Sequence, residues 1–303
     1  MVNTVPVQRE ALHEAVPEVA AFARPAVRLH PRQAEPTAEQ SSAGGPLLWP
    51  EHEAWPTCDG HQGRPRELAP LVQLFKHDLP ADRALPDWMF PGSSDLLHIL
   101  WCPEEHGEAR LPTARLAWRN ASALVDASAR LPEPRDLDRA EAIPLPCVLH
   151  PEVVTELPPL NYAGDDPTES ELVPPILPAE LNERLSAWRH PSEPERPDGA
   201  SHYWALATAP GWKLGGWADY ASYPGRYARC PCGAQTRLVA DLMSAEGLDS
   251  WWQPSAAPDF PWKGAPYDWS FHEPTQLRLG RDGFQALFGC TADPGHPLIT
   301  YIE

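Results

Sequence analysis

The stretch Lys213-Leu214-Gly215-Gly216-Trp217, followed by Cys230-Pro231-Cys232-Gly233, decides the organisation of this chain, because a related order of residues occurs earlier. Gly44-Gly45-Pro46 precedes Cys58-Asp59-Gly60-His61 at a similar spacing. The two Gly-Gly pairs are 171 residues apart, and the first cysteines of the two copies are 172 residues apart. In both copies an apolar run follows, and then a further cysteine and histidine. The sequence therefore predicts an internally duplicated, two-lobe fold.

Each copy carries thiol and imidazole side chains at the spacing of a structural metal site. The two sets are Cys58, His61, Cys102 and His106, and Cys230, Cys232, Cys290 and His296. Thiolate sulfur and neutral imidazole nitrogen are good zinc ligands, and four of them complete a tetrahedral site. Asp293 is a candidate substitute ligand in the second set. The alternative is that these residues are separate core positions, since a free cysteine packs like a small hydrophobic side chain. Cys147 lies outside both sets and is assigned to the core.

The composition predicts a β-rich α+β fold with long proline-rich loops. The chain has 39 prolines and 13 tryptophans in 303 residues, and this proline content is more than twice the usual share of about 5%. Proline ends helices and interrupts strands, so it lengthens the connections between elements. Strands are expected in the short apolar runs at 71–75, 95–101, 114–119, 238–242, 276–279 and 284–289.

Four segments follow from the repeats and the proline distribution. They are a leader at 1–40, a first repeat at 41–130, a connector at 131–200 and a second repeat at 201–303. The connector is rich in proline and has an acidic run at 164–171. It also contains one short predicted helix, because Pro178 and Glu180 both suit a helical first turn.

The charge balance bears on the class of partner. The formal net charge is -18, from 42 acidic and 24 basic residues. Such a field repels nucleic-acid phosphates and anionic lipid, and it attracts a basic protein. Solubility alone is the alternative reason for the charge. The sequence therefore favours a basic protein client over nucleic acid.

Neither a membrane span nor a secretory signal is evident. No apolar run reaches the roughly 18–20 residues that cross a bilayer, and the first 23 residues carry acids among alanines and valines. These residues resemble a short amphipathic helix rather than a signal peptide. We therefore expect a cytoplasmic protein, where reduced cysteines favour metal binding over disulfides.

Several segments of the two copies resemble a known family. The segment from Gly44 to Pro50, the later Trp55-Pro56 and the strand with Gln73 resemble the YwqG-like family, a domain of unknown function. The residues 213–217 and 230–233 look like the same signature in a second copy. The pattern is also distantly similar to the programmed-cell-death-2 proteins, which pair a Gly-Gly loop with cysteine pairs.

The resemblance covers the two repeat cores, about half of the chain. It implies a duplicated α+β fold with pseudo-two-fold symmetry. For the eukaryotic relatives it implies the escort of a newly made ribosomal protein, whereas bacterial relatives sometimes look like immunity proteins of toxin systems. This chain departs from the family in having Cys58-x-x-His61 where relatives often have a cysteine pair.

The sequence contains no recognised catalytic motif. It has no Gly-x-Ser-x-Gly elbow, no phosphate-binding loop and no His-Glu-x-x-His pair. A non-enzymatic protein-binding module that escorts or neutralises a basic client is therefore the preferred hypothesis, and no catalytic residue is assigned. A hydrolase of unknown specificity that uses Asp59, His61 or His106 is an alternative.

Tryptophans near the Gly-Gly loops are the candidate binding residues, since aromatic side chains are enriched at interface hot spots. They are Trp49, Trp212, Trp217, Trp251 and Trp252. Packing in the core is the alternative role for these side chains. Carbohydrate or small-ligand binding on Trp-rich loops is a further alternative function.

Overall fold

The structure is a computed structural model. It describes residues 4–61, 65–106, 111–124, 126–132, 142–161, 173, 175–194, 201–218, 225–246, 251–252, 269–279 and 283–302. The acidic run at 164–171 of the predicted connector lies outside these residues.

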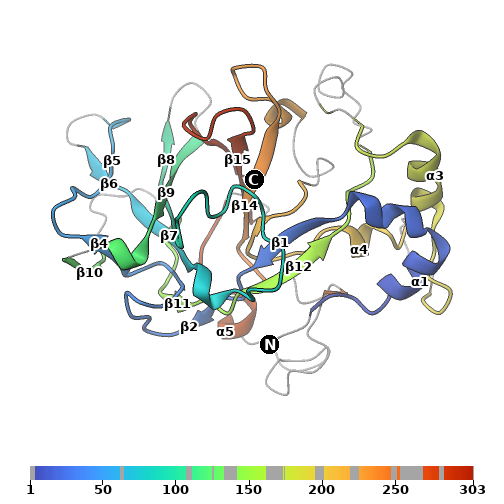
Figure 1. The fold of residues 1–303 in the computed structure, drawn as a ribbon, viewed down its shortest axis with the longest axis horizontal. Coiled ribbons are helices and arrows are strands. Elements are labelled where there is room, and N and C mark those ends of the chain that lie inside the picture. Colours follow the sequence, from blue (N-terminus) through green and yellow to red (C-terminus); the bar gives the residue numbers. More distant parts are fainter. Residues whose placement is uncertain are drawn as a thin grey trace.

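Two six-stranded antiparallel sheets form the body of the molecule (Figure 1). Sheet one has the order β2 (Arg32–Gln33), β11 (Cys147–Val148), β3 (Ser42–Ala43), β7 (Ala69–Phe75), β8 (Leu96–His106) and β9 (Leu111–Arg119). Sheet two has the order β12 (Glu152–Glu156), β1 (Arg24–Arg28), β13 (Lys213–Gly215), β14 (Thr236–Met243), β15 (Phe284–Cys290) and β16 (Ile299–Ile302). The chain is thus a strand-rich α+β protein.

Two smaller two-stranded sheets lie beside sheet one. They pair β4 (Leu47–Pro50) with β10 (Ala127–Arg130), and β5 (Thr57–Cys58) with β6 (Arg66–Glu67). The indole Nε1 of Trp55 donates to the carbonyl of Leu68 at 2.8 Å, which fixes the loop between β4 and β5 against the chain leading into β7. This brings the end of β5 over β8, where the first metal-ligand candidates lie.

The chain crosses between the two sheets at two neighbouring points. The chain leaves β1 in sheet two and enters β2 in sheet one, and it returns from β11 in sheet one to β12 in sheet two. The strands β1 and β12 come from the predicted leader and connector, so both segments contribute to the sheet of the second repeat.

The sheets share one hydrophobic core. Leu74 and Ile99 of sheet one belong to the same buried cluster as Leu214 and Leu287 of sheet two. All four side chains are fully buried, so each contributes about 1.5–3 kcal/mol relative to exposure. This burial holds the two sheets together as one packed body.

A helical layer covers one end of sheet two (Figure 1). It consists of α1 (Arg9–Ala15), the 3₁₀ helix η1 (Pro17–Phe22), α3 (Ala179–Ala187) and α4 (Trp204–Ala207). Leu12 and Leu185 are fully buried in a separate apolar cluster between these helices. The remaining helices among the described residues are η2 (Lys76–Asp78), η3 (Ala121–Ala123), η5 (Gly225–Ala228) and α5 (Trp269–His272). No described helix has the length and apolar character needed to cross a bilayer.

The second Gly-Gly motif surrounds a buried carboxylate. Glu156, at the end of β12, accepts hydrogen bonds from the backbone N–H groups of Ala209 and Trp217, both at 2.8 Å, and from Lys213 Nζ at 2.8 Å. Gly216 has φ of 78°, and a Cβ atom there would lie 2.2 Å from Glu156 Oε2. Glycine is therefore required both by the backbone and by the close approach of the carboxylate.

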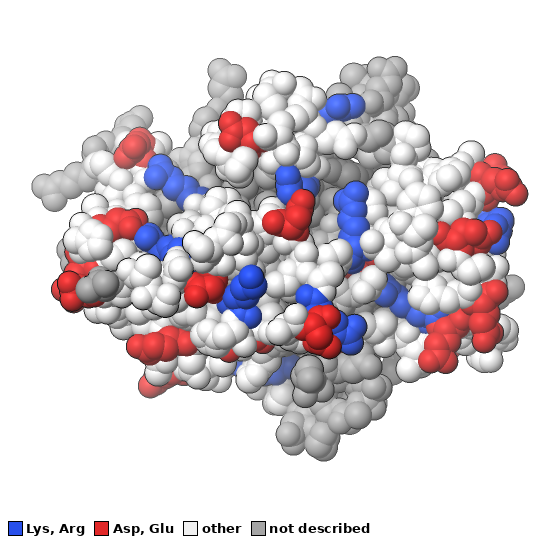
Figure 2. Space-filling view, viewed as in Figure 1, with Lys and Arg blue, Asp and Glu red and all other residues white. Residues whose placement is uncertain are grey.

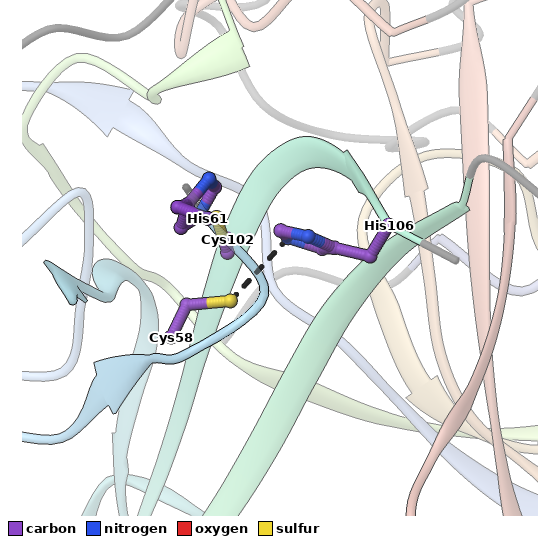
Figure 3. Close-up of side chains that lie close together, drawn as sticks. All are labelled: Cys58, His61, Cys102 and His106. Carbon is purple, nitrogen blue, oxygen red and sulfur yellow. Dashed lines mark hydrogen bonds between the residues drawn. The ribbon is translucent and has the colours of Figure 1, made fainter. Parts of the chain in front are cut away.

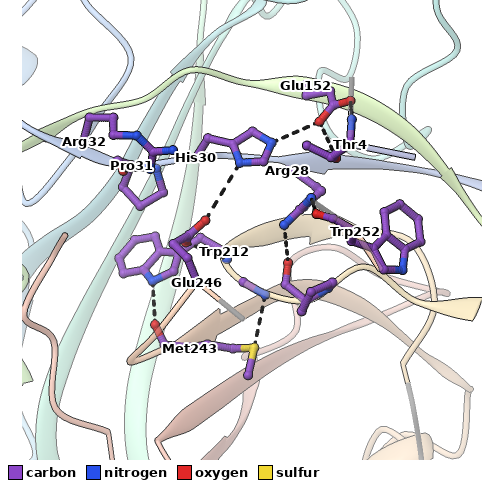
Figure 4. Close-up of polar contacts among 12 residues, drawn as sticks. Thr4, Arg28, His30, Pro31, Arg32, Glu152, Trp212, Met243, Glu246 and Trp252 are labelled. Atoms are coloured by element: carbon purple, nitrogen blue, oxygen red, sulfur yellow. Dashed lines mark hydrogen bonds and ion pairs between the residues drawn. The ribbon is translucent and has the colours of Figure 1, made fainter. Parts of the chain in front are cut away.

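A buried polar network lies where β1 passes toward β2 (Figure 4). His30 Nε2 is 3.0 Å from Glu152 Oε2, and Glu152 also accepts from the backbone N–H and the hydroxyl of Thr4. Arg28 donates to the carbonyl of Trp252 at 3.0 Å. Burial lowers the pKa of His30, so its imidazole is neutral at pH 7. The network gives hydrogen-bond partners to His30, Glu152 and the terminal nitrogens of Arg28, while Arg28 Nε has none among the described residues.

The apolar runs predicted most of the long strands. Those at 71–75, 95–101, 114–119, 238–242 and 284–289 lie largely within β7, β8, β9, β14 and β15. The prediction of a strand at 276–279 was wrong, because these residues have irregular backbone. Gln276 has φ of 48°, which an extended strand cannot accommodate, although Leu277 and Leu279 are buried as the apolar run suggested.

Candidate metal centres

Centre one is built from two segments held by the core beneath sheet one. Cys58 ends β5 and His61 follows it in a loop, whereas Cys102 and His106 lie on the last part of β8. Cys58 and Cys102 belong to one buried cluster with Trp55. Cys102 and His106 are four residues apart, so a regular strand places both side chains on one face but about 13 Å apart. The pairing of β8 with β9 shifts register between them, and this irregularity bends the strand so that both side chains can reach one point.

The four side chains of centre one converge (Figure 3). Cys58 Sγ is 3.4 Å from His106 Nε2, and His61 Nε2 is 3.1 Å from Cys102 Sγ. One ligand atom from each residue lies within 4.8 Å of all the others. A tetrahedral zinc site has Zn–S of about 2.3 Å and Zn–N of about 2.0 Å, which places its ligand atoms roughly 3.3–3.8 Å apart. Centre one could therefore hold a metal ion with small side-chain adjustments.

The protonation states of the side chains of centre one are compatible with a metal ion that displaces the thiol proton of Cys102. Burial lowers the pKa of His61 and that of His106, so both rings are neutral and can offer a lone pair at pH 7. Burial raises the pKa of Cys102 to about 12, so its thiol keeps its proton without a cation nearby. A divalent cation favours the thiolate, and its binding would release this proton.

Centre two combines a tight turn with the end of β15. Cys230 and Cys232 lie in the turn before β14, where the carbonyl of Cys230 accepts from Gly233 N–H at 2.8 Å. Gly233 has φ of 90°, which lets the turn close back on itself. Cys290 is the last residue of β15, and His296 follows in a second turn.

The ligand atoms of centre two also lie within 4.8 Å of one another. Cys230 Sγ is 3.6 Å from His296 Nδ1, and Cys232 Sγ is 3.7 Å from Cys290 Sγ. Burial raises the pKa of Cys290, but hydrogen bonds from the backbone of Asp293, the side chain of His296 and the backbone of Ala292 outweigh it and lower that pKa to about 6. The Cys290 thiol is therefore largely ionised at pH 7, which is the form that binds a metal.

Asp293 supports centre two from outside the quartet. Its Oδ2 is 3.5 Å from His296 Nε2, the ring nitrogen that does not face the cysteines. Its Oδ1 accepts from Gly295 N–H at 2.8 Å and shapes the turn. A carboxylate beside the second nitrogen fixes the orientation of a metal-ligating imidazole. The sequence offered Asp293 as a substitute ligand, whereas the structure places it behind His296.

No family model matches this chain, and no related sequence was found among curated proteins. The metal centres therefore rest on their own geometry. Two thiols with two imidazoles, and three thiols with one imidazole, are donor sets that tetrahedral zinc sites use. All six cysteines are free, and Cys147 is fully buried outside both quartets, with its Sγ donating to the carbonyl of Pro274 at 3.3 Å.

The candidate binding tryptophans lie mainly in the interior. Their exposed fractions are 2% for Trp49, 1% for Trp212, 7% for Trp217 and 2% for Trp252, and Trp251 is half-buried. Their ring contacts are typical of core packing. Trp49, for example, stacks on His98 with the ring centroids 5.7 Å apart. The structure does not present the four buried rings as surface anchors. Sequence alone could not separate the two roles, because large aromatic side chains occur in both.

Proposed function

We propose that this protein is a non-enzymatic binding module in which a structural zinc ion fastens a loop or turn to each of the two six-stranded sheets. The convergence of two separate Cys/His quartets carries this proposal. Each quartet fastens a loop or turn that has little regular structure of its own to the end of a long strand. Zinc binding at such a point contributes directly to folding free energy.

The donor sets favour a structural role over a catalytic one. Four protein ligands fill a tetrahedral zinc ion, whereas a catalytic zinc keeps one position open for water or substrate. Cys58 and Cys102 are 6% and 2% exposed, so the two sulfur ligands of centre one are largely shielded from solvent. The hydrolase alternative gains no specific support from this geometry.

Elemental analysis of purified, untagged protein tests the zinc proposal. We expect two zinc ions per chain. Cys102→Ser should lower the content to one by removing centre one, and Cys290→Ser should do so by removing centre two. Cys147→Ser is the matched control, because Cys147 is a buried cysteine outside both quartets, and it should retain both ions. Metal-free wild-type protein that stays folded would refute the proposal.

We also propose that the two sheets arose by internal duplication, with pseudo-two-fold symmetry. The register of the strands supports this. Val72 pairs with Ile99 beside a bulge in β7, and Cys102 follows Ile99 by three residues. Ala240 pairs with Leu287 beside a bulge in β14, and Cys290 follows Leu287 at the same distance. The resemblance to the YwqG-like family, which implies the same symmetry, remains a prediction.

A basic protein is the client that we propose for the module. The net charge of -18 supports this choice, because an acidic field speeds the approach of a basic partner. Figure 2 shows acidic side chains gathered over α1 and α3 at one end of this face. The exposed acids of this helical layer are Glu10, Glu14, Glu18, Glu180 and Glu183. Escort and neutralisation of a basic client are equally compatible with such a surface.

Binding of an oligolysine peptide, followed by fluorescence anisotropy, tests the proposed client class. Affinity should fall several-fold between about 50 mM and about 200 mM salt, because the Debye length shortens. Glu10→Lys with Glu14→Lys should weaken binding, whereas Glu51→Lys with Asp82→Lys, which changes the net charge equally outside the helical layer, should weaken it less. Equal effects of the two pairs would show that only net charge matters.

A further inference from the structure

The three cysteines of centre two differ in their exposure to solvent. Cys230 and Cys290 are buried, whereas Cys232 is exposed at the turn before β14. In centre one both cysteines, Cys58 and Cys102, are buried. A small reagent dissolved in water therefore has readier access to a cysteine of centre two than to either cysteine of centre one.

Cys232 and Cys290 are placed to form a disulfide. Their Sγ atoms lie 3.7 Å apart, so a disulfide bond of about 2.05 Å requires the two sulfurs to approach by about 1.7 Å. Cys290 is paired in sheet two with Thr236, whereas Cys232 belongs to a turn outside the strands. The turn can therefore supply the movement without disturbing the sheet. The remaining sulfur, that of Cys230, lies 3.6 Å from His296 Nδ1.

The donor set makes the thiolates of centre two more reactive than those of centre one. Three thiolates around a zinc dication leave one excess negative charge, whereas the two thiolates of centre one balance the charge of the ion. A zinc-bound thiolate that retains more negative charge is the stronger nucleophile, and the thiolate is the form of cysteine that oxidants attack. Exposure and charge thus both favour oxidation of centre two.

We propose that centre two is a redox switch, in which hydrogen peroxide joins Cys232 to Cys290 and releases the zinc ion. The switch rests on the proposed binding of zinc and adds a means of regulating it at one of the two centres. Centre one stays loaded under the same conditions, so the two centres have different roles.

The oxidation takes two steps. The thiolate of Cys232 attacks one oxygen of the peroxide, which forms an S–O bond, breaks the O–O bond and releases hydroxide. The thiolate of Cys290 then attacks the sulfur of Cys232, which forms the S–S bond and expels the oxygen as a second hydroxide. The two thiolates together lose two electrons, and one peroxide becomes two waters once the hydroxides take up protons from the solvent.

Loss of two of the four ligands frees the turn that carries His296. This turn is closed on itself, because His296 N–H donates to the carbonyl of Asp293 at 3.2 Å and Gly295 N–H donates to Asp293 Oδ1 at 2.8 Å. Residues 294–298 form one wall of a cavity of about 620 Å³ that lies between the two metal centres, and residues 57–60 with His106 form another. Oxidation therefore loosens one wall of this cavity, while zinc in centre one holds the other.

Treatment of the zinc-loaded full chain with hydrogen peroxide, followed with a colorimetric zinc indicator, tests the proposal. Protein with two zinc ions should lose one of them roughly tenfold faster than the other, because oxidation follows the exposure of the thiolate. Mass spectrometry of the proteolysed product should find Cys232 joined to Cys290. A dithiol reductant with added zinc should then restore the lost ion.

Variants identify the ion that is lost. Cys102→Ser, which lacks centre one, should release its one remaining ion in peroxide, whereas Cys290→Ser, which lacks centre two, should keep its one ion. Cys232→His replaces the exposed thiol by an imidazole, so it should bind two zinc ions and lose neither at the fast rate. Cys147→Ser is the matched control, because it removes a buried cysteine outside both quartets, and it should behave as wild type.

The zinc content before treatment separates this proposal from the proposed function. Protein that holds no zinc at the start would contradict both, whereas protein that holds two ions and keeps them in peroxide would contradict the switch alone. The switch is also overturned if both ions leave at one rate, if the disulfide joins other cysteines, or if Cys232→His with two ions still loses one at the fast rate. If Cys232→His binds only one ion, the disulfide found in wild type decides.

Discussion

Replacing Lys213 by methionine should destabilise the protein by about 3 kcal/mol. Lys213 Nζ lies 2.8 Å from Glu156 Oε1, and the two side chains are 2% and 0% exposed. Removing one partner of a buried ion pair leaves an uncompensated charge, which costs roughly 3–5 kcal/mol. Glu156 keeps hydrogen bonds from the backbone N–H groups of Ala209 and Trp217, so the expected cost lies at the lower end of this range.

Urea denaturation of zinc-loaded protein, monitored by circular dichroism, measures this cost. The double variant Lys213→Met with Glu156→Gln removes both charges, so its destabilisation should be less than the sum of the single effects by about 2 kcal/mol. Arg184→Met is the control, because Arg184 also pairs with a glutamate, Glu18, at 2.8 Å but in an exposed position. It should leave stability unchanged within error, since water screens exposed pairs.

Two results would refute this reasoning. If Lys213→Met cost no more than the exposed control, the carboxylate of Glu156 would have to reach solvent in the variant. If the effects of the two single variants were additive, Lys213 and Glu156 would not interact energetically. In either case the account of the second Gly-Gly motif as the surroundings of a buried charge pair would fail.

Three further predictions follow from the structure. Gly216→Ala should cost several-fold more stability than Gly92→Ala in thermal denaturation, because both glycines have positive φ but only Gly216 has a carboxylate in the place of the new Cβ atom; equal losses would contradict this. Burial lowers the pKa of His98 to about 3, so the unfolded chain gains a proton below about pH 6.5 that the folded protein does not, and stability should fall by about 2 kcal/mol between pH 6.5 and 5. The variant His98→Gln should lose that part of the pH dependence in urea titrations, and an unchanged slope would refute the assignment. A chelator should remove zinc in two phases, with centre two first because Cys232 is exposed, and Cys232→Ser should eliminate the fast phase in a colorimetric zinc assay.

The hydrogen bonds of Gln73 in sheet one could not be predicted from the sequence pattern. Gln73 lies in an apolar strand, fully buried, and its side chain accepts from His98 Nε2 at 2.9 Å and from Leu48 N–H at 2.7 Å. Its amide donates to the carbonyls of Ala38 and Gln40. Periodicity placed the strand correctly, but it could not show that one polar side chain joins three separate segments. Long-range hydrogen bonds of this kind depend on which segments meet in space.

The sequence by itself determined the strand-rich class and the residues of both candidate centres. Period-two and short apolar runs identify strands locally, and sulfur and imidazole side chains are chemically distinct wherever they occur. The tertiary structure alone decided that β1 and β12, from the predicted leader and connector, complete sheet two. It also decided that the tryptophans beside the Gly-Gly loops are mostly buried, and that one cavity separates the two centres. These features arise from contacts between residues more than 100 positions apart, such as Val27 with Val153 and β9 with β16, and no local pattern encodes such contacts because their energy exists only once the chain has folded.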